Sequence, residues 1–216
     1  MADTETSTTL APAEQDNQTR RRLLCAAVDV FDRKGYAAAS VREIVERAGV
    51  AKPALYYHFG SKEGVLTAVL EEAAEGFRQK LDAAMARSGT ARERLFALCA
   101  DLYDMFQEHV PVARVAHAVF FGSTEGMPSF DFTVFDREVE RVVGRIVEDG
   151  RATGEIAVDT SPPDLALMMM GIIGVFTMRQ LHYGVSAIDR ETLQRMVGLL
   201  FDGARGQQGQ QGEPRS

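Results

Sequence analysis

Side chains that can donate hydrogen bonds are concentrated between residues 42 and 62. Lysine and arginine match the acceptor atoms on guanine edges, whereas tyrosine and histidine suit phosphate oxygens. A small alanine can meet the methyl group of thymine. The candidate residues for contact with double-stranded DNA are Arg42, Lys52, Ala54, Tyr56, Tyr57, His58 and Lys62.

Two short helices over about residues 40–59 are expected to position these side chains. Ser40 and Glu43 have the spacing of a capping box, which predicts the start of the first helix, and Gly49 predicts its end. The second helix follows at once, over about residues 51–59. Two short helices joined by a glycine-containing turn are typical of a helix-turn-helix unit.

A third helix before this pair completes a three-helix unit over residues 18–65. Its apolar residues recur at helical spacing, and Gly35 follows its last turn. Leu55 and Phe59 of the later helix are expected to face inward. The residues that form the stripe of the first helix are Leu24, Ala27, Val28 and Phe31.

The remaining chain also has helical periodicity, so we predict an all-α protein with about nine helices. A larger body is expected over residues 66–205, and the polar ends 1–17 and 206–216 are expected to be disordered. The later helices are expected near residues 61–87, 91–109, 111–121, 132–152, 162–183 and 189–204.

The charge of the chain is unevenly distributed, although its net charge is −7. Residues 18–60 hold eight basic and four acidic side chains, a net charge of +4. A small basic segment attached to an acidic body is compatible with binding to DNA. On charge alone, chance remains an equal explanation.

The stretch from Gly35 to Glu63 resembles the N-terminal domain of the TetR (tetracycline-repressor) family. The matching elements are Gly35-Tyr36, Ser40-Val41-Arg42-Glu43-Ile44, Ala48-Gly49-Val50, Leu55-Tyr56-Tyr57-His58-Phe59 and Ser61-Lys62-Glu63. The resemblance implies contact with operator DNA by Ser40, Arg42, Lys52, Tyr56, Tyr57, His58 and Lys62. Ala51 stands where many members have a serine, so the recognition helix should begin without a side-chain cap.

For the body, the resemblance implies only a helical domain that binds a ligand and dimerises. Taken one by one, the apolar, aromatic and methionine side chains there are better explained as ordinary core, but as a group they suit an apolar pocket. The candidate ligand-binding residues are Phe96, Tyr103, His117, Phe120, Phe121, Met169, Phe176 and His182. The histidines lack metal spacing, no catalytic residues are assigned, and no cofactor is expected.

The helices near 162–183 and 189–204 are expected to form a homodimer interface. The first is apolar almost all round, and Gly171 and Gly174 would allow a second helix to approach closely. Its longest uncharged run, Leu165–Met178, is shorter than a membrane span, so no membrane partner is expected. Cys25 and Cys99 lack disulfide and zinc spacing, which indicates two buried thiols in the cytoplasm.

The sequence therefore predicts a non-enzymatic, cytoplasmic repressor that a small apolar or aromatic molecule releases from a palindromic operator. The alternative is a small helical enzyme that binds a metabolite and carries a degenerate helix-turn-helix. A DNA-binding protein without a ligand is a third possibility, which the methionine-rich body disfavours.

Overall fold

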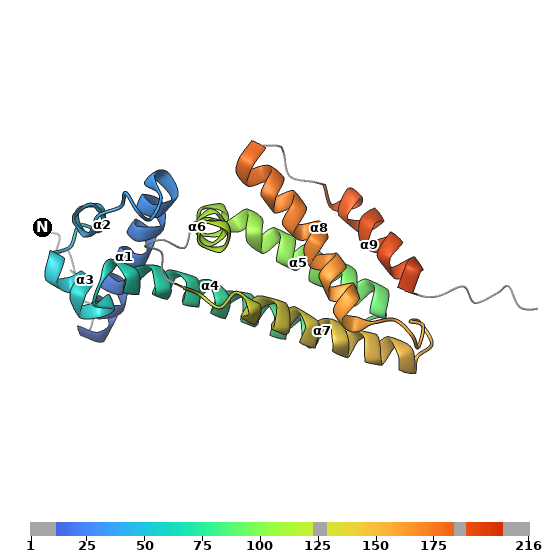
Figure 1. Ribbon diagram of the computed structural model, residues 1–216. Helices are drawn as coiled ribbons and strands as arrows, with labels where there is room; N and C mark the ends of the chain where they lie inside the picture. The colour runs from blue at the N-terminus through green and yellow to red at the C-terminus, as the bar shows by residue number, and fades with distance from the viewer. Residues whose placement is uncertain (1–11, 123–128, 184–188, 205–216) are drawn as a thin grey trace, which may run out of the picture. The chain divides into compact units, whose positions relative to one another are not determined.

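The computed structural model describes residues 12–122, 129–183 and 189–204, and these residues form helices without any strand (Figure 1). The helices are α1 (Pro12–Lys34), α2 (Val41–Ala48), α3 (Lys52–Phe59), α4 (Lys62–Met85), α5 (Ala91–Glu108), α6 (Val110–Phe121), α7 (Thr133–Ala152), α8 (Pro162–Tyr183) and α9 (Arg190–Ala204). The all-α prediction is confirmed, and the helices lie near their predicted positions except at the start of α1. The tail 206–216 lies outside the described residues.

The described chain divides into two compact units, and α4 and α6 contribute residues to the first. This unit comprises residues 12–72, 111–122 and 129–130. Its core brings together Leu23, Ala27 and Phe31 of α1, Ile44 of α2, Leu55 of α3, Leu66 of α4 and Val115 of α6, all buried. Burial of these apolar side chains is the main force that holds α2 and α3 against α1.

The prediction of disorder for residues 12–17 is wrong, because α1 already begins at Pro12. Proline suits the first turn of a helix, and Glu14 lies in that turn, where the helix dipole favours an acid. The Asp16 carboxylate lies 3.6 Å from Nε2 of His58 on α3. Polar composition suggested a disordered arm, but good helix formers and this contact with α3 extend the helix. Residues 1–11 lie outside the described part of the chain.

The first unit also differs from its predicted boundary at residue 65, because it includes most of α6. Val115 of α6 is buried in its core, and Arg114 donates to both carboxylate oxygens of Asp32 on α1, at 2.7 and 2.8 Å. Sequence periodicity predicted α6 as a helix but could not show which core it joins.

The second unit comprises residues 73–110, 131–183 and 189–204. Helix α5 packs against α7, α8 and α9, and α7 packs against α8. Its core includes Phe77 of α4, Leu98 and Leu102 of α5, Val143 and Ile146 of α7, Met169 of α8 and Val197 of α9. Cys99 is buried in this core, whereas Cys25 on α1 is exposed, so the expectation of two buried thiols is wrong for Cys25.

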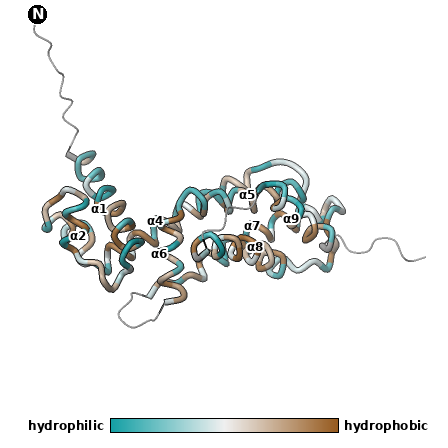
Figure 2. The backbone as a smooth tube through the Cα atoms, turned by 90° about the horizontal axis from the view of Figure 1, so that it is seen from above, coloured by the Kyte–Doolittle hydropathy of each residue, from teal (hydrophilic) through white to brown (hydrophobic). Residues whose placement is uncertain are grey.

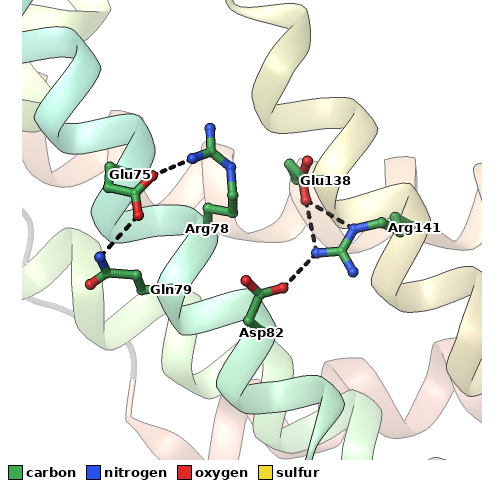
Figure 3. A network of polar contacts seen from close by, with 6 residues as sticks. All are labelled: Glu75, Arg78, Gln79, Asp82, Glu138 and Arg141. Atoms are coloured by element: carbon green, nitrogen blue, oxygen red, sulfur yellow. Dashed lines mark hydrogen bonds and ion pairs between the residues drawn. The ribbon is translucent and has the colours of Figure 1, made fainter.

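Arg141 of α7 links the second half of α4 to α7 within this unit (Figure 3). Its guanidinium donates to Asp82 of α4 at 2.7 Å and lies 2.9 Å from Glu138. The rings of Phe77 on α4 and Phe135 on α7 also meet edge to face, with their centroids 5.0 Å apart. Polar and aromatic contacts therefore both hold α4 to α7.

Candidate nucleic-acid interface

The capping box at the start of α2 is present as predicted. The Ser40 hydroxyl accepts from the Glu43 amide at 3.3 Å, and the Ser40 amide donates to the Glu43 carboxylate at 3.1 Å. Gly49 ends the helix with φ 63°, a left-handed conformation that glycine adopts without strain. Arg22 of α1 donates to the Gly49 carbonyl at 3.0 Å, which holds the turn between α2 and α3.

Acid should weaken the first unit through Glu43. Hydrogen bonds, chiefly from Lys34 and secondly from Ser40, lower the pKa of this carboxyl from 4.5 to about 2. Because the folded-state pKa is lowered, the stabilisation is complete above about pH 4.5 and is lost as the pH falls toward 2. Denaturant titrations at several pH values should show a smaller acid-dependent loss in Glu43→Gln than in the parent. Glu71→Gln, an exposed change on α4, is the control, and equal losses in all three proteins would contradict the assignment.

Helix α3 presents an amine and two phenols to solvent. Lys52 is exposed, and Tyr56 and Tyr57 are 46% and 77% exposed, while Leu55 is fully buried. The Lys52 Nζ lies 5.7 Å from the centroid of the Tyr56 ring. Ala51 begins the helix without a side-chain hydrogen bond, as expected. The packing of Leu55 therefore fixes which face of α3 is available to DNA.

Arg42 on α2 is exposed, but its guanidinium forms an ion pair with Glu46. Its Nε donates to Glu46 one turn later at 2.6 Å, and this hydrogen bond raises the pKa of the Arg42 guanidinium. A contact between Arg42 and a guanine would require this ion pair to separate. Lys52 is consequently the stronger of these two candidates for reading a base.

The structure differs from the expected exposure of His58 and Ala54. The His58 side chain is only 7% exposed, and its Nε2 lies 3.6 Å from the Asp16 carboxylate of α1. Ala54 is half-buried. Both residues were assigned to the DNA-facing set, and their contact with DNA stays a prediction.

Lys62 makes contacts within the protein, and its contact with a phosphate stays a prediction. Its Nζ donates to the carbonyls of Tyr36 and Ala39 at 2.8 and 2.9 Å, and it lies 4.3 Å from the centroid of the Tyr36 ring. The residues of the DNA-facing set that remain exposed are Ser40, Arg42, Lys52, Tyr56 and Tyr57.

The eight predicted ligand-binding residues are distributed over both units. In the second unit, Tyr103 of α5 and Met169 of α8 are buried, and Phe96 and Phe176 pack partly buried against the same core. His117, Phe120 and Phe121 belong to α6 in the first unit, and the side chain of His182 lies outside the described part. Four of the eight therefore share one core.

Two polar residues of the second unit were not predicted as ligand-binding residues. The Gln107 Nε2 atom on α5 and the Thr177 Oγ1 atom on α8 are buried and have no hydrogen-bond partner among the described residues. Helices α5 and α8 pack side by side (Figure 1). Buried polar groups normally have partners, so these two are candidates for binding a ligand or water. Because Gln107 and Thr177 are far apart in the sequence, no local pattern could predict that both would be buried between the same helices.

A cavity of about 190 Å³ lies in the first unit between α1 and α6. It is lined by Phe31, Asp32, Gly35, Tyr36, Arg114, Val115, Ala118 and Val119. None of the sixteen predicted site residues lines it. Its volume is below the ~300–1,000 Å³ of typical ligand pockets, so it does not replace the second unit as the candidate for ligand binding.

An exposed recognition helix, the capped helix before it and a separate helical body define the class of helix-turn-helix DNA-binding regulators. Residues 23–69 match the family model described as bacterial regulatory proteins, tetR family. The chain is 30% identical over 153 residues to the transcriptional repressor NicS of Pseudomonas putida, covering 69% of this chain and 71% of NicS. This chain belongs to the TetR family of transcriptional regulators.

Other similarities cover less of the relative or show only the fold. The transcriptional activator FasR of Mycolicibacterium smegmatis is 40% identical over 93 residues, which is 43% of this chain and 42% of FasR. The chain thus spans less than half of that relative. The regulator FadR from Bacillus subtilis, solved in complex with stearoyl-CoA, has a TM-score of 0.70 at 21% identity, over 85% of this chain and 98% of FadR.

Proposed function

We propose that this protein is a cytoplasmic, ligand-responsive repressor that binds a palindromic operator as a homodimer. The observation that carries the proposal is the exposed face of α3, where Lys52, Tyr56 and Tyr57 project from a helix that Leu55 anchors in the core. Relatives named as regulators favour this function over a metabolite-binding enzyme.

In this proposal α3 lies in the major groove and α2 crosses the DNA backbone. Lys52 donates to guanine O6 or N7, while the Tyr57 hydroxyl donates to a phosphate oxygen. Ser40, at the N-terminus of α2, is exposed and can contact a phosphate beside the groove. Two copies would read half-sites separated by roughly 34–36 Å, one turn of DNA.

An apolar face of α8 supports the homodimer. Leu167, Gly171 and Val175 follow one another at four-residue spacing, so they share one face of the helix, and the two apolar side chains are 73% and 58% exposed. A Cβ at Gly171 or Gly174 would meet nothing within 4 Å. Hydrophobic residues recur along α8 (Figure 2). We propose that a second copy covers this face.

The same helix is long and apolar enough to cross a membrane, the single such case among the described residues, and 22% of its apolar window is buried. Leu165, Met169 and Ile173 on its other side are buried in the core formed with α5, α7 and α9. Because α8 contributes buried residues from Leu165 to Ile173 to that core, we propose a dimer interface rather than a membrane span.

The effector is proposed to bind in the second unit, near the packed faces of α5 and α8. Phe96, Tyr103, Met169 and Phe176 supply an apolar surface there. Gln107 and Thr177 supply polar groups that lack partners in the described structure. FadR, which has a similar fold, was solved in complex with stearoyl-CoA, a molecule that joins a long apolar acyl chain to a polar coenzyme A. Molecules that carry acyl chains are therefore suitable first probes.

A selection of bound sequences from random duplex DNA tests the proposed function. The parent protein should enrich one palindrome, and a member of a library of acyl and aromatic molecules should release it. Lys52→Ala should lower operator affinity by ~1–3 kcal/mol and relax the preference at one position of each half-site. Lys80→Ala, which removes an exposed charge from α4, should leave both unchanged. An unaltered preference in Lys52→Ala would show that α3 does not read the operator as proposed.

A further inference from the structure

The cavity between α1 and α6 lies wholly within the first unit, whereas the proposed effector site belongs to the second. Of the residues that line it, Phe31 and Val115 are buried, while Arg114 and Ala118 are exposed. The buried side chains therefore form its deep end, and the exposed ones stand at its mouth. A small molecule can thus reach the apolar wall from solvent.

The volume of this cavity, about 190 Å³, suits a single aromatic ring. In an engineered protein, an apolar cavity of about 150 Å³ binds benzene. Pockets for larger ligands typically have ~300–1,000 Å³. The size therefore selects a molecule of one ring with one small substituent and excludes a long acyl chain.

Aromatic and aliphatic side chains form most of the wall. The rings of Phe31 and Tyr36 have their centroids 5.5 Å apart and their planes tilted by 54°. Val115 and Val119 line the cavity from α6. Aromatic rings attract one another in tilted and offset arrangements, so a bound ring would gain contacts of this kind while its apolar surface leaves water.

One ion pair supplies the charged part of the lining. Nη1 of Arg114 donates to both carboxylate oxygens of Asp32, at 2.7 and 2.8 Å. A guanidinium has five N–H donors, and those on Nε and Nη2 of Arg114 have no partner among the described residues. The Arg114 side chain is 44% exposed and that of Asp32 only 16%. A ligand therefore reaches the remaining guanidinium donors more easily than the carboxylate, which favours an anion over a cation.

We propose that this cavity binds a single-ring aromatic carboxylic acid, with its ring against Phe31 and Tyr36 and its carboxylate on the remaining donors of Arg114. The planar carboxylate matches the fork of donors on a guanidinium, and hydrogen bonds between charged groups are stronger than neutral ones. The site shares no residue with the proposed effector site. Binding there does not depend on the proposed DNA-binding function.

The first test uses 4-fluorobenzoate as the probe and follows its fluorine NMR signal in the absence of DNA. The parent should bind the acid about tenfold more tightly than 4-fluorobenzyl alcohol, because the alcohol keeps the ring but lacks the charge. In Arg114→Gln the acid should bind about tenfold more weakly, while the affinity for the alcohol stays unchanged. Absence of binding by the parent, or equal affinities for the acid and the alcohol, would overturn the proposal.

The second test fills the cavity. Ala118→Leu adds a branched side chain at the mouth and should abolish binding of both probes. Ala113→Leu is the matched control, because Ala113 belongs to the same helix but does not line the cavity. Thermal unfolding followed by circular dichroism checks that both variants are folded. Undiminished binding in Ala118→Leu would show that the acid binds elsewhere.

Methyl NMR spectra of the parent identify where the probe binds, whatever the variants do. Addition of 4-fluorobenzoate should shift the methyl signals of Val115 and Val119 and leave those of Val143 and Val197, in the core of the second unit, unchanged. Shifts in the second unit alone would place the acid in the region of the proposed effector site, and this proposal would fail. If the parent binds the acid at the cavity but selects no DNA sequence, the cavity site stands and the DNA-binding function fails.

Discussion

Aspartate at positions 167 and 175 is expected to convert the proposed dimer to monomers. The double change Leu167→Asp and Val175→Asp places two charges on the apolar face of α8, where a second copy would bury them without partners. Because two linked half-site contacts exceed one by about 10²–10⁴ in affinity, binding to the full palindrome should fall by a factor of this order. Light scattering and titration of operator DNA measure the two effects.

Val158→Asp is the matched control, because Val158 is 83% exposed and lies outside α8 and α9. Its mass in solution and its operator affinity should equal those of the parent. The α8 variant should keep its helix content, since both altered residues are solvent-exposed within one chain. An α8 variant that remains dimeric would exclude this face as the interface. Val197 is unsuitable as a probe, since it is only 2% exposed and belongs to the core.

Alanine at position 64 is expected to destabilise the first unit and to weaken operator binding. A Cβ at Gly64 would lie 1.9 Å from the carbonyl oxygen of Phe59, a backbone atom that cannot rotate away as a side chain would. The clash must displace the end of α3 or the first turn of α4. Overpacking of this kind destabilises proteins by ~1–3 kcal/mol, and occasionally more. We expect operator affinity to fall by at least about tenfold because Phe59 ends the recognition helix.

Gly76→Ala, on the same helix, is the control, and we expect it to raise the free energy of unfolding where Gly64→Ala lowers it. A Cβ at Gly76 meets nothing within 4 Å, so alanine should stabilise α4 by about 0.5–1 kcal/mol. Urea denaturation of both variants and the parent measures the difference. If Gly64→Ala proved as stable as Gly76→Ala, the close approach of α3 and α4 would not be a constraint on the motif.

Local sequence patterns were sufficient to predict the helices and most of their ends. The Ser40–Glu43 capping box and the left-handed glycines at positions 35 and 49 act within a few residues of the chain, so their effects are visible in the sequence. The buried positions of Ile44 and Leu55 follow from helical periodicity for the same reason. The spacing of Lys52, Tyr56 and Tyr57 relative to Leu55 likewise predicted an exposed face on α3.

Contacts between residues distant in the chain could not be predicted in this way. His58 was expected to be exposed, but Asp16, forty-two positions earlier, lies beside it because α1 is longer than its polar composition indicated. For Lys62 a contact with a phosphate was expected, and its hydrogen bonds to the carbonyls of Tyr36 and Ala39 were not. In both cases the side chain has the chemistry that the sequence suggested. A segment distant in the chain contacts His58, and another accepts hydrogen bonds from Lys62.

The sequence by itself therefore determined the helices, the motif and the kinds of side chain available to bind DNA, because hydrophobic periodicity and capping are local properties of the chain. Only the tertiary structure decided that α6 packs with the first core, that Gln107 and Thr177 are buried without partners among the described residues, and that Gly64 leaves room for the Phe59 carbonyl. These outcomes depend on which helix faces pack together, and that choice is made by the burial of whole surfaces rather than by any short segment.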